Sequence, residues 1–193
     1  GFRGEALPSI AAVSRLQITS ATGPGRAWQI AAEAGRKGEP APASRARGTT
    51  VEVADLFFAT PARLKFLKTD RAEYMAARDM VQRLAMAWPR IGFSLEHDGQ
   101  LSFRYAPETA ADDGEALKSR LSAVLGRDFY ASAFAVLAER EGLRLHGYAG
   151  LPTYARGTAQ DQYLFVNRRP VRDRLFQGAV RGAYADVLAR DRH

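Results

Sequence analysis

Pro61 divides this chain into two parts with different predicted structure. Proline has no backbone N–H for a sheet ladder and fits the first turn of a helix, so the strand predicted over residues 49–56 must end before it. Beyond it, Asp70 can cap a long helix that stops at Trp88, just before a second proline. We therefore predict two domains, residues 1–67 and 68–193.

The first domain combines a short helix with strands. The apolar spacing after the N-terminal turn predicts a helix that ends near Arg15, and alternation with period two predicts strands over 16–20 and 28–34. Residues 35–47 are rich in Gly, Pro, Ala and basic residues, so we expect a loose loop there.

The second domain is predicted to be α+β, with helices against one mixed sheet. The long helix carries apolar residues at three- and four-residue steps that we expect to form core: Tyr74, Ala77, Val81, Leu84 and Trp88. Asp98-Gly99 is a strong signal for a tight hairpin turn. Further predicted elements are a helix over 115–125, strands over 129–138, 143–149 and 162–167, and a last helix over 172–188 with Phe176, Val180, Ala183 and Val187 facing inward.

The first seven residues form a glycine-rich turn that leads into a helix. Gly1 and Gly4 are three residues apart with Arg3 between them. Such a turn presents unpaired backbone N–H groups and the positive end of a helix dipole, which suits phosphate oxygens. Many similar turns only cap a helix and bind nothing, so spacing alone favours capping.

The net charge of +7 is concentrated in two stretches. Residues 61–90 hold seven Lys/Arg against three acids, and residues 166–193 hold the same numbers. Local basic surface favours a polyanion, and nucleic acid before membrane, because no amphipathic helix with a bulky apolar face accompanies it. An ordinary solvated charged surface is the alternative.

Composition restricts the other function classes. The chain has no cysteine, and His97, His146 and His193 stand apart without ligand spacing, so we predict no metal site. No apolar run approaches the roughly 20 residues that a membrane span needs, and no secretion signal opens the chain. We expect a cytoplasmic protein with no membrane partner.

Four strings of residues, in order, resemble the MutL family of DNA mismatch-repair proteins. They are Gly-Phe-Arg-Gly-Glu-Ala-Leu from Gly1, Gly-Thr-Thr-Val-Glu-Val from Gly48, Leu-Phe-Phe-Ala-Thr-Pro-Ala-Arg-Leu-Lys-Phe-Leu from Leu56, and Tyr-Leu-Phe-Val-Asn-Arg-Arg-Pro-Val-Arg-Asp-Arg from Tyr163. One departure is Ala59, where the family usually has Asn, which puts any polar role there in doubt.

The resemblance implies a fold and a missing part. The family belongs to the GHKL ATPases, with gyrase-type topoisomerases, certain chaperones and histidine kinases. Residues 1–67 would be the C-terminal part of the ATPase α/β sandwich, and 68–193 a second, transducer domain resembling a ribosomal protein, truncated at its end. The family's catalytic Glu, Mg-binding Asn and adenine-holding loop would precede Gly1, and the Lys that reaches the terminal phosphate would follow His193. We therefore expect an internal fragment with no catalytic and no metal-binding residue. ATP and Mg would belong to the intact protein and be neither required nor retained here.

The resemblance also names binding residues. Backbone amides matching Arg3, Gly4, Glu5, Ala6 and Leu7 would wrap the ATP phosphates, and Thr49 would lie near adenine. Glu5, in the first helical turn, is better suited to capping than to activating water. Basic positions matching Lys65, Lys68 and Arg174 are associated with DNA binding in the family. The second basic stretch adds Arg169, and helical spacing places Arg181 on the same side as Arg174. We expect sequence-independent contacts to the DNA backbone.

These residues leave two main function classes open. The intact protein would be an ATPase that mediates mismatch repair, forms an ATP-dependent homodimer, and links a mismatch-recognition protein to a downstream repair nuclease or helicase. Alternatively, the chain is a DNA- and protein-binding module only. A gyrase-type subunit is a weaker alternative, because the motifs after residue 60 and around Asn167 are MutL-like in combination.

Overall fold

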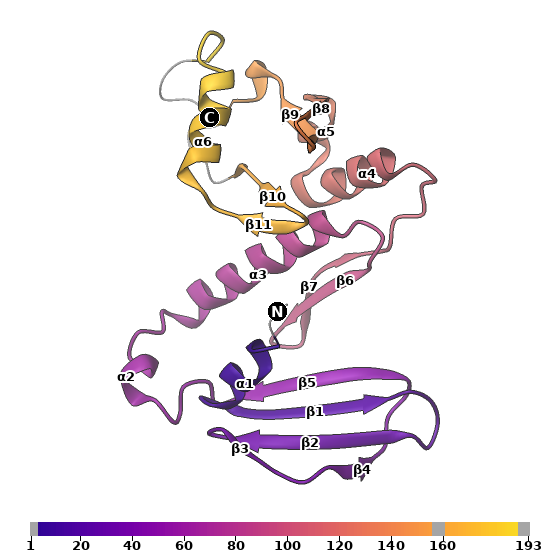
Figure 1. Ribbon diagram of the computed structural model, residues 1–193, viewed down its shortest axis with the longest axis vertical. Coiled ribbons are helices and arrows are strands. Elements are labelled where there is room, and N and C mark those ends of the chain that lie inside the picture. Colours follow the sequence, from indigo (N-terminus) through magenta and orange to yellow (C-terminus); the bar gives the residue numbers. More distant parts are fainter. Residues whose placement is uncertain (1–3, 156–160, 189–193) are drawn as a thin grey trace. The chain divides into compact units, whose positions relative to one another are not determined.

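A computed structural model of the chain describes residues 4–155 and 161–188. The chain divides into two compact units, residues 1–69 and 70–193 (Figure 1). Sequence analysis placed the junction between residues 67 and 68.

Unit 1 is built on a five-stranded antiparallel sheet in the order β3-β2-β1-β5, with β4 also paired to β2. The central strand β1 (Arg15–Ala21) pairs along all seven residues with β2 (Ala27–Glu33) on one side and β5 (Gly48–Ala54) on the other. Because side chains alternate along a strand, Leu16 and Ile18 share one face with Val53 and Val51, their partners on β5. The strands predicted here are confirmed to within two residues at each end.

Helix α1 (Ala6–Ala11) leads into this sheet and is shorter than expected, since it ends four residues before Arg15. The chain after it is tied to the sheet by backbone hydrogen bonds. Gly35 N–H donates to Ala11 O at 2.9 Å, and Phe57 N–H donates to Val13 O at 2.7 Å. These bonds use carbonyls that a longer helix would have bonded internally.

Residues 35–47 are not the loose loop that composition suggested. They contain β3 (Arg36–Lys37) and β4 (Ala41–Ala43), which both pair with β2. The free edge of β2 offers unpaired N–H and C=O groups, so a segment without strand propensity of its own is drawn into the sheet. After β5, Pro61 opens the single-turn helix α2 (Pro61–Leu64) at its first position, as predicted.

Unit 2 opens with α3 (Asp70–Ala87), whose limits match the predicted helix. The face it buries differs from the predicted one. Arg83, Ala85 and Met86 are buried, whereas Leu84 and Trp88 are 37% and 39% exposed. The buried side is the one that meets polar partners, because Gln82 donates to the Tyr105 hydroxyl and the Ala85 carbonyl accepts from Arg120. The spacing of apolar residues along α3 could not predict this buried side, because Arg120 of a later helix organises it.

The strands in the described part of unit 2 form three separate antiparallel pairs rather than the one mixed sheet expected. The pairs are β6 (Phe93–His97) with β7 (Gln100–Tyr105), β8 (Ala133–Arg140) with β9 (Leu143–Gly150), and β10 (Leu164–Val166) with β11 (Arg169–Val171). Each pair joins neighbours in sequence through a tight turn, which needs no crossover. The predicted Asp98-Gly99 turn is confirmed, with both residues at positive φ, 50° and 73°. The α+β class holds.

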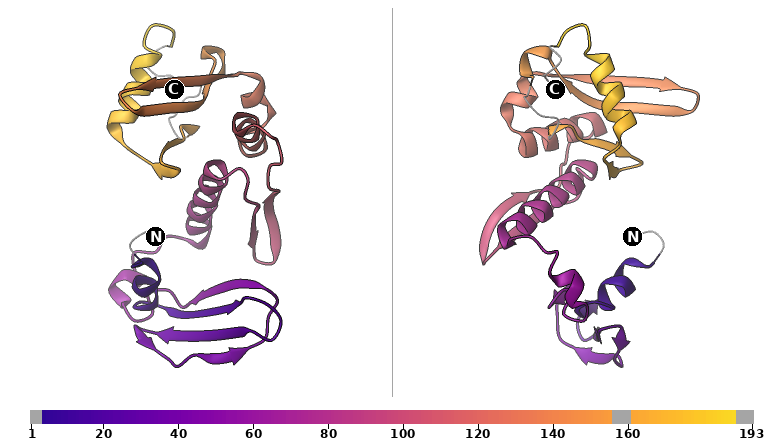
Figure 2. Two further views of the ribbon diagram at one scale, coloured as in Figure 1. Left: turned by 45° about the vertical axis from the view of Figure 1, so that its right-hand side comes forward. Right: turned by 90° about the vertical axis from the view of Figure 1, so that its left-hand side faces the viewer.

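The remaining elements of unit 2 are α4 (Asp113–Leu125), α5 (Arg127–Ala131), the 3-10 turn η1 (Pro152–Tyr154) and α6 (Arg174–Ala183). Residues 129–131 were predicted as strand but belong to α5, because a short apolar run does not distinguish the two. The β8–β9 hairpin extends well beyond the other elements of this unit (Figure 2). No helix in the described ranges is long and apolar enough to cross a membrane.

Helix α6 begins with a side-chain cap, since Asp173 Oδ1 accepts from the backbone N–H of Leu175 at 2.8 Å. Its apolar side was expected to face inward, yet none of its residues is buried. Phe176 is 42% exposed, and Val180 is only half-buried. The helix therefore lies on the surface of the unit over its whole length.

Among the described residues of unit 2, Arg120 is the most enclosed polar side chain, with an exposed fraction of 0%. From α4, its guanidinium donates to backbone carbonyls at 2.6–3.1 Å in three segments, namely those of Ala85, Pro89, Ile91 and Ala106. Glu108 lies 3.5 Å from its Nε. Burial lowers the pKa of Arg120, and the Glu108 charge opposes that shift. Arg120 thus links α4 to the end of α3 and to the ends of the β6–β7 hairpin in the interior of this unit.

Candidate functional site

The glycine turn before α1 is exposed to solvent. Gly4 has φ +70°, a left-handed conformation that favours glycine, and a Cβ added there would meet no atom of the described residues, its chain neighbours aside, within 4 Å. Residues 4–7 are all exposed. Glu5 occupies the N-cap position, but its side chain makes no capping hydrogen bond, contrary to the role expected for it. Arg3 lies outside the described residues. Among the described residues, the turn from Gly4 to Leu7 is therefore exposed and its Gly4 Cβ position is uncovered.

Thr49 lies on β5 opposite Ser20 of β1, and their hydroxyl oxygens are 2.8 Å apart. The next residue points to the other face, where Thr50 Oγ1 accepts from Arg45 Nη1 at 2.6 Å. Arg45 also donates to the Thr19 carbonyl at 2.9 Å, so the start of β5 is fixed from both faces. No hydrogen bond among the described residues joins Thr49 to the turn at Gly4–Leu7. Nor does that part of the chain hold a cluster of three or more His, Asp or Glu that could bind a metal.

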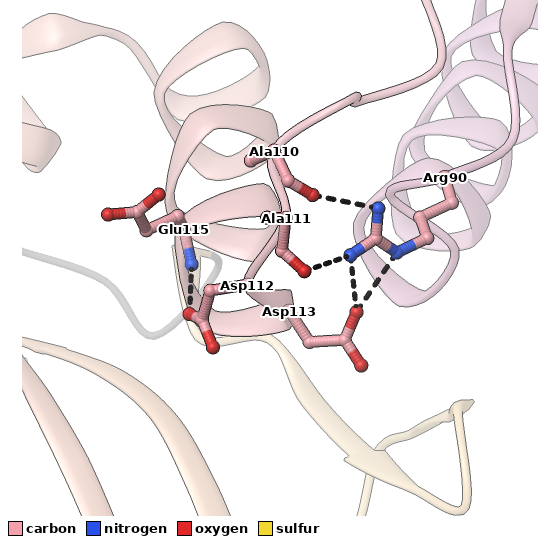
Figure 3. Close-up of polar contacts among 6 residues, drawn as sticks. All are labelled: Arg90, Ala110, Ala111, Asp112, Asp113 and Glu115. Carbon is pink, nitrogen blue, oxygen red and sulfur yellow. Dashed lines mark hydrogen bonds and ion pairs between the residues drawn. The ribbon is translucent and has the colours of Figure 1, made fainter.

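The first basic stretch, residues 61–90, contains exposed lysines after α2 and an arginine, Arg90, that is bonded to the start of α4. Lys65 is exposed and follows α2, with Lys68 three residues further on in the same segment. Arg90 is held in place by the start of α4 (Figure 3). It donates through Nε and Nη2 to Asp113 Oδ1 at 2.9 and 2.8 Å, and also to the Ala110 and Ala111 carbonyls. Arg90 therefore stabilises the fold, and its charge is already compensated.

Asp79 joins two more arginines. Its Oδ2 accepts from Arg83 Nε and from Arg172 Nη2, both at 2.8 Å, so α3 is bridged to the residue after β11. The Arg83 guanidinium also lies 4.5 Å from the ring centroid of Tyr163. Burial raises the pKa of Tyr163, and Asp161 adds to that shift, so its hydroxyl stays protonated at neutral pH.

In the turn between β10 and β11, a further cation contacts another part of the unit. Asn167 and Arg168 both have positive φ, 48° and 64°, which is typical of a two-residue hairpin turn and uncommon for arginine. The Arg168 guanidinium lies 4.7 Å from the Trp88 ring, which ties the turn to the end of α3. Arg169 follows on β11 opposite Val166.

Arg174 and Arg181 remain directed to solvent. They are seven residues apart on α6, which is two helical turns, so both lie on one face about 10 Å apart along the axis. Within the described part of the chain, neither takes part in a hydrogen bond or an ion pair. Gly178 lies midway on the same face, and a Cβ added there would meet nothing within 4 Å. This face of α6 therefore carries two exposed arginines with a glycine, which has no side chain, between them.

The structure thus brings Arg174 and Arg181 together on one helix, whereas Lys65 and Lys68 belong to the other unit. Sequence analysis missed Phe66, which follows Lys65 and is 85% exposed. An aromatic residue between two lysines was visible in the sequence. The pairing of Arg172 with Asp79 was not visible in the sequence, because the two residues are 93 positions apart.

Comparisons with known proteins agree on one class. A family model described as "DNA mismatch repair protein, C-terminal domain" matches residues 121–193. The fold resembles that of an Aquifex aeolicus MutL ATPase domain complexed with ADP, with a TM-score of 0.70 and 26% identity over 92% of this chain and 67% of that one. A solved N-terminal domain of a DNA repair protein shares the fold, with a TM-score of 0.78 and 24% identity over 96% of this chain and 60% of that chain. The fold is therefore that of the GHKL-type ATPase region of mismatch-repair proteins.

Sequence relatives narrow the class. The chain is 58% identical over its whole length to the DNA mismatch repair protein MutL of Rhodospirillum rubrum, of which it covers 31%. It is 56% identical to MutL of Caulobacter vibrioides, again over its whole length, and covers 30% of that protein. The chain belongs to the MutL family. It spans about a third of the length of these relatives.

Proposed function

We propose that the protein containing this chain is a DNA mismatch-repair mediator that binds and hydrolyses ATP and binds DNA without sequence preference. The observation that carries the proposal is 58% identity to a MutL protein along the entire chain. In this proposal, unit 1 is the later part of the ATPase domain, and unit 2 is the transducer domain that follows it.

The nucleotide would be held by backbone rather than by charged side chains. The turn from Gly4 to Leu7 fits phosphate oxygens, since Gly4 has free space at its Cβ position and the residues are exposed. Thr49 would contact the adenine side of the same ligand, and Arg3 would add a cation. A solved relative with the same fold is described as complexed with ADP, which supports nucleotide binding in the intact protein. The general base and the Mg ligand would come from residues outside this chain.

DNA would contact Lys65 and Lys68 on unit 1 and Arg169, Arg174 and Arg181 on unit 2. Backbone contacts of this kind make affinity fall with salt, with a slope of roughly −0.9 per phosphate neutralised on duplex DNA. We expect Arg174→Glu to lower the affinity for every duplex sequence similarly and to flatten the slope by about one or more. The matched control is Arg26→Glu, because Arg26 is also exposed but lies outside both basic stretches. Equal losses at the two positions would mean diffuse binding and would refute this surface.

A second candidate function is a DNA- and protein-binding module without ATPase activity. It is favoured by the exposed cations Arg174 and Arg181 of α6. ATP turnover by the intact protein separates the two candidates. We expect turnover there and none from residues 1–193 alone. Steady hydrolysis by residues 1–193, lost on mutation of one of their own residues, would show that the base lies within them.

The remaining partners follow from family membership. We infer that the intact protein forms an ATP-dependent homodimer and contacts a mismatch-recognition protein and a downstream nuclease or helicase. Sedimentation of the intact protein with and without a non-hydrolysable ATP analogue tests the dimer. A sedimentation coefficient unchanged by the analogue would contradict it.

A further inference from the structure

The segment after α2 presents an aromatic ring to solvent. Phe66 is 85% exposed, the highest value for any large apolar side chain in the described ranges, and Leu64 and Leu67 on either side are 47% and 39% exposed. Single exposed apolar residues are common on proteins. Three in four positions, with the aromatic one outermost, form a local apolar surface that suggests a binding role.

The backbone of this segment is ordered by hydrogen bonds. Thr60 O accepts from Arg63 N–H at 2.8 Å, and the Phe66 and Leu67 N–H groups donate to Arg63 O and Leu64 O at 3.0 and 3.2 Å. These successive turns define the chain path through residue 67. Phe66 is therefore presented by an ordered backbone, so the conformational entropy lost when the ring is covered is mainly that of its side chain.

The charge around the ring has one sign. From Leu56 to Thr69 the chain carries Arg63, Lys65 and Lys68 and no acidic residue. Cations interleaved with an aromatic residue are the combination that binds single-stranded nucleic acid, where cations follow the phosphates and rings stack on bases. In a duplex the base faces are covered by neighbouring base pairs, so a ring of this kind gains nothing from them.

We propose that Phe66 stacks on an unpaired nucleobase while Lys65 contacts an adjacent phosphate. This inference rests on the DNA binding proposed above and assigns to unit 1 a contact that is specific for single strands. Stacking tolerates any base, because every base has a π face, so the contact is compatible with sequence-independent binding. A phosphate-only surface would not distinguish single strands from duplex in this way.

The test uses the intact protein, an oligothymidine and a blunt duplex of mixed sequence. Phe66→Leu keeps an apolar side chain but removes the π face, and it should lower affinity for the oligothymidine at least about fivefold. Duplex affinity should stay within about twofold, because no phosphate contact is lost. Phe66→Trp should retain single-strand binding. The matched control is Leu143→Ala, since Leu143 is 76% exposed but lies outside both basic stretches.

Salt dependence separates the ring from its neighbour. Lys65→Gln should weaken binding to both DNAs and flatten the single-strand slope by roughly 0.7, whereas Phe66→Leu should leave the slope unchanged. Full single-strand affinity in Phe66→Leu, or an equal loss on duplex, would overturn the stacking role. So would Phe66-dependent binding to vesicles of phosphatidylserine and phosphatidylcholine without an effect on DNA. If Lys65→Gln and Arg174→Glu also leave DNA binding intact, the proposed function itself fails.

Discussion

Helices α3 and α6 both draw arginines from basic stretches of the same net charge, yet they use them differently. Arg83 of α3 is 4% exposed and is engaged by Asp79 and Tyr163, whereas Arg174 and Arg181 of α6 are exposed and carry no such partner in the described structure. The net charge of a sequence stretch therefore does not predict how much positive charge the helix within it exposes to solvent. Of these arginines, Arg174 and Arg181 are the ones whose charge remains available to a polyanion.

The largest effect should come from the arginine that organises the end of α3. Arg120→Met keeps much of the volume but removes the donors to four carbonyls and leaves Glu108 without its cation. We expect a loss of about 3–5 kcal/mol in the free energy of unfolding. Urea denaturation followed by circular dichroism measures it. A loss below about 1 kcal/mol would mean that the arginine environment of α3 is as dispensable as a surface charge.

A smaller effect is expected at Asp79, which holds two arginines but is itself about one-third exposed. Asp79→Asn should cost about 1–2 kcal/mol, since solvent screens part of the interaction and Arg83 loses its anion. Asp186→Asn, at an exposed carboxylate near the end of α6, serves as the control and should change little. Equal stability changes at the two positions would remove the distinction between the helices.

The smallest effect concerns Gly178 on α6, where stability and binding should move in opposite directions. Gly178→Ala should raise the free energy of unfolding by about 0.5–1 kcal/mol, because alanine favours helix and nothing obstructs its methyl group. The same methyl group stands between Arg174 and Arg181 and should weaken DNA binding. Gly23→Ala, in a turn of unit 1 with equally open space, should leave DNA binding unchanged. Tighter binding by Gly178→Ala would argue against close approach of DNA to this face.

Local signals in the sequence predicted much of the fold. Asp98-Gly99 predicted its hairpin, because two consecutive positive φ angles are needed there. Pro61 predicted a helical first turn. These signals work because they concern the backbone of a few adjacent residues.

Features that depend on distant segments were not predictable. The pairing of β3 and β4 depends on the free edge of β2, and the buried face of α3 depends on Arg120, whose partner Ala85 is 35 residues away. Among the candidate site residues, sequence located the cations of α6 on one face. It could not separate them from Arg168 and Arg172, which Trp88 and Asp79 engage.

Arg120 has one more consequence for unit 2. Carbonyls from several segments often converge on a buried water molecule or a bound metal ion, and either can exchange with solvent. Here the carbonyls meet the Arg120 guanidinium, which is covalently part of α4. It therefore cannot be removed by a chelator or exchange with solvent. It also arrives only when α4 docks. The last turn of α3 and the ends of the β6–β7 hairpin therefore share one donor. We expect these segments to fold and open as a single cooperative unit.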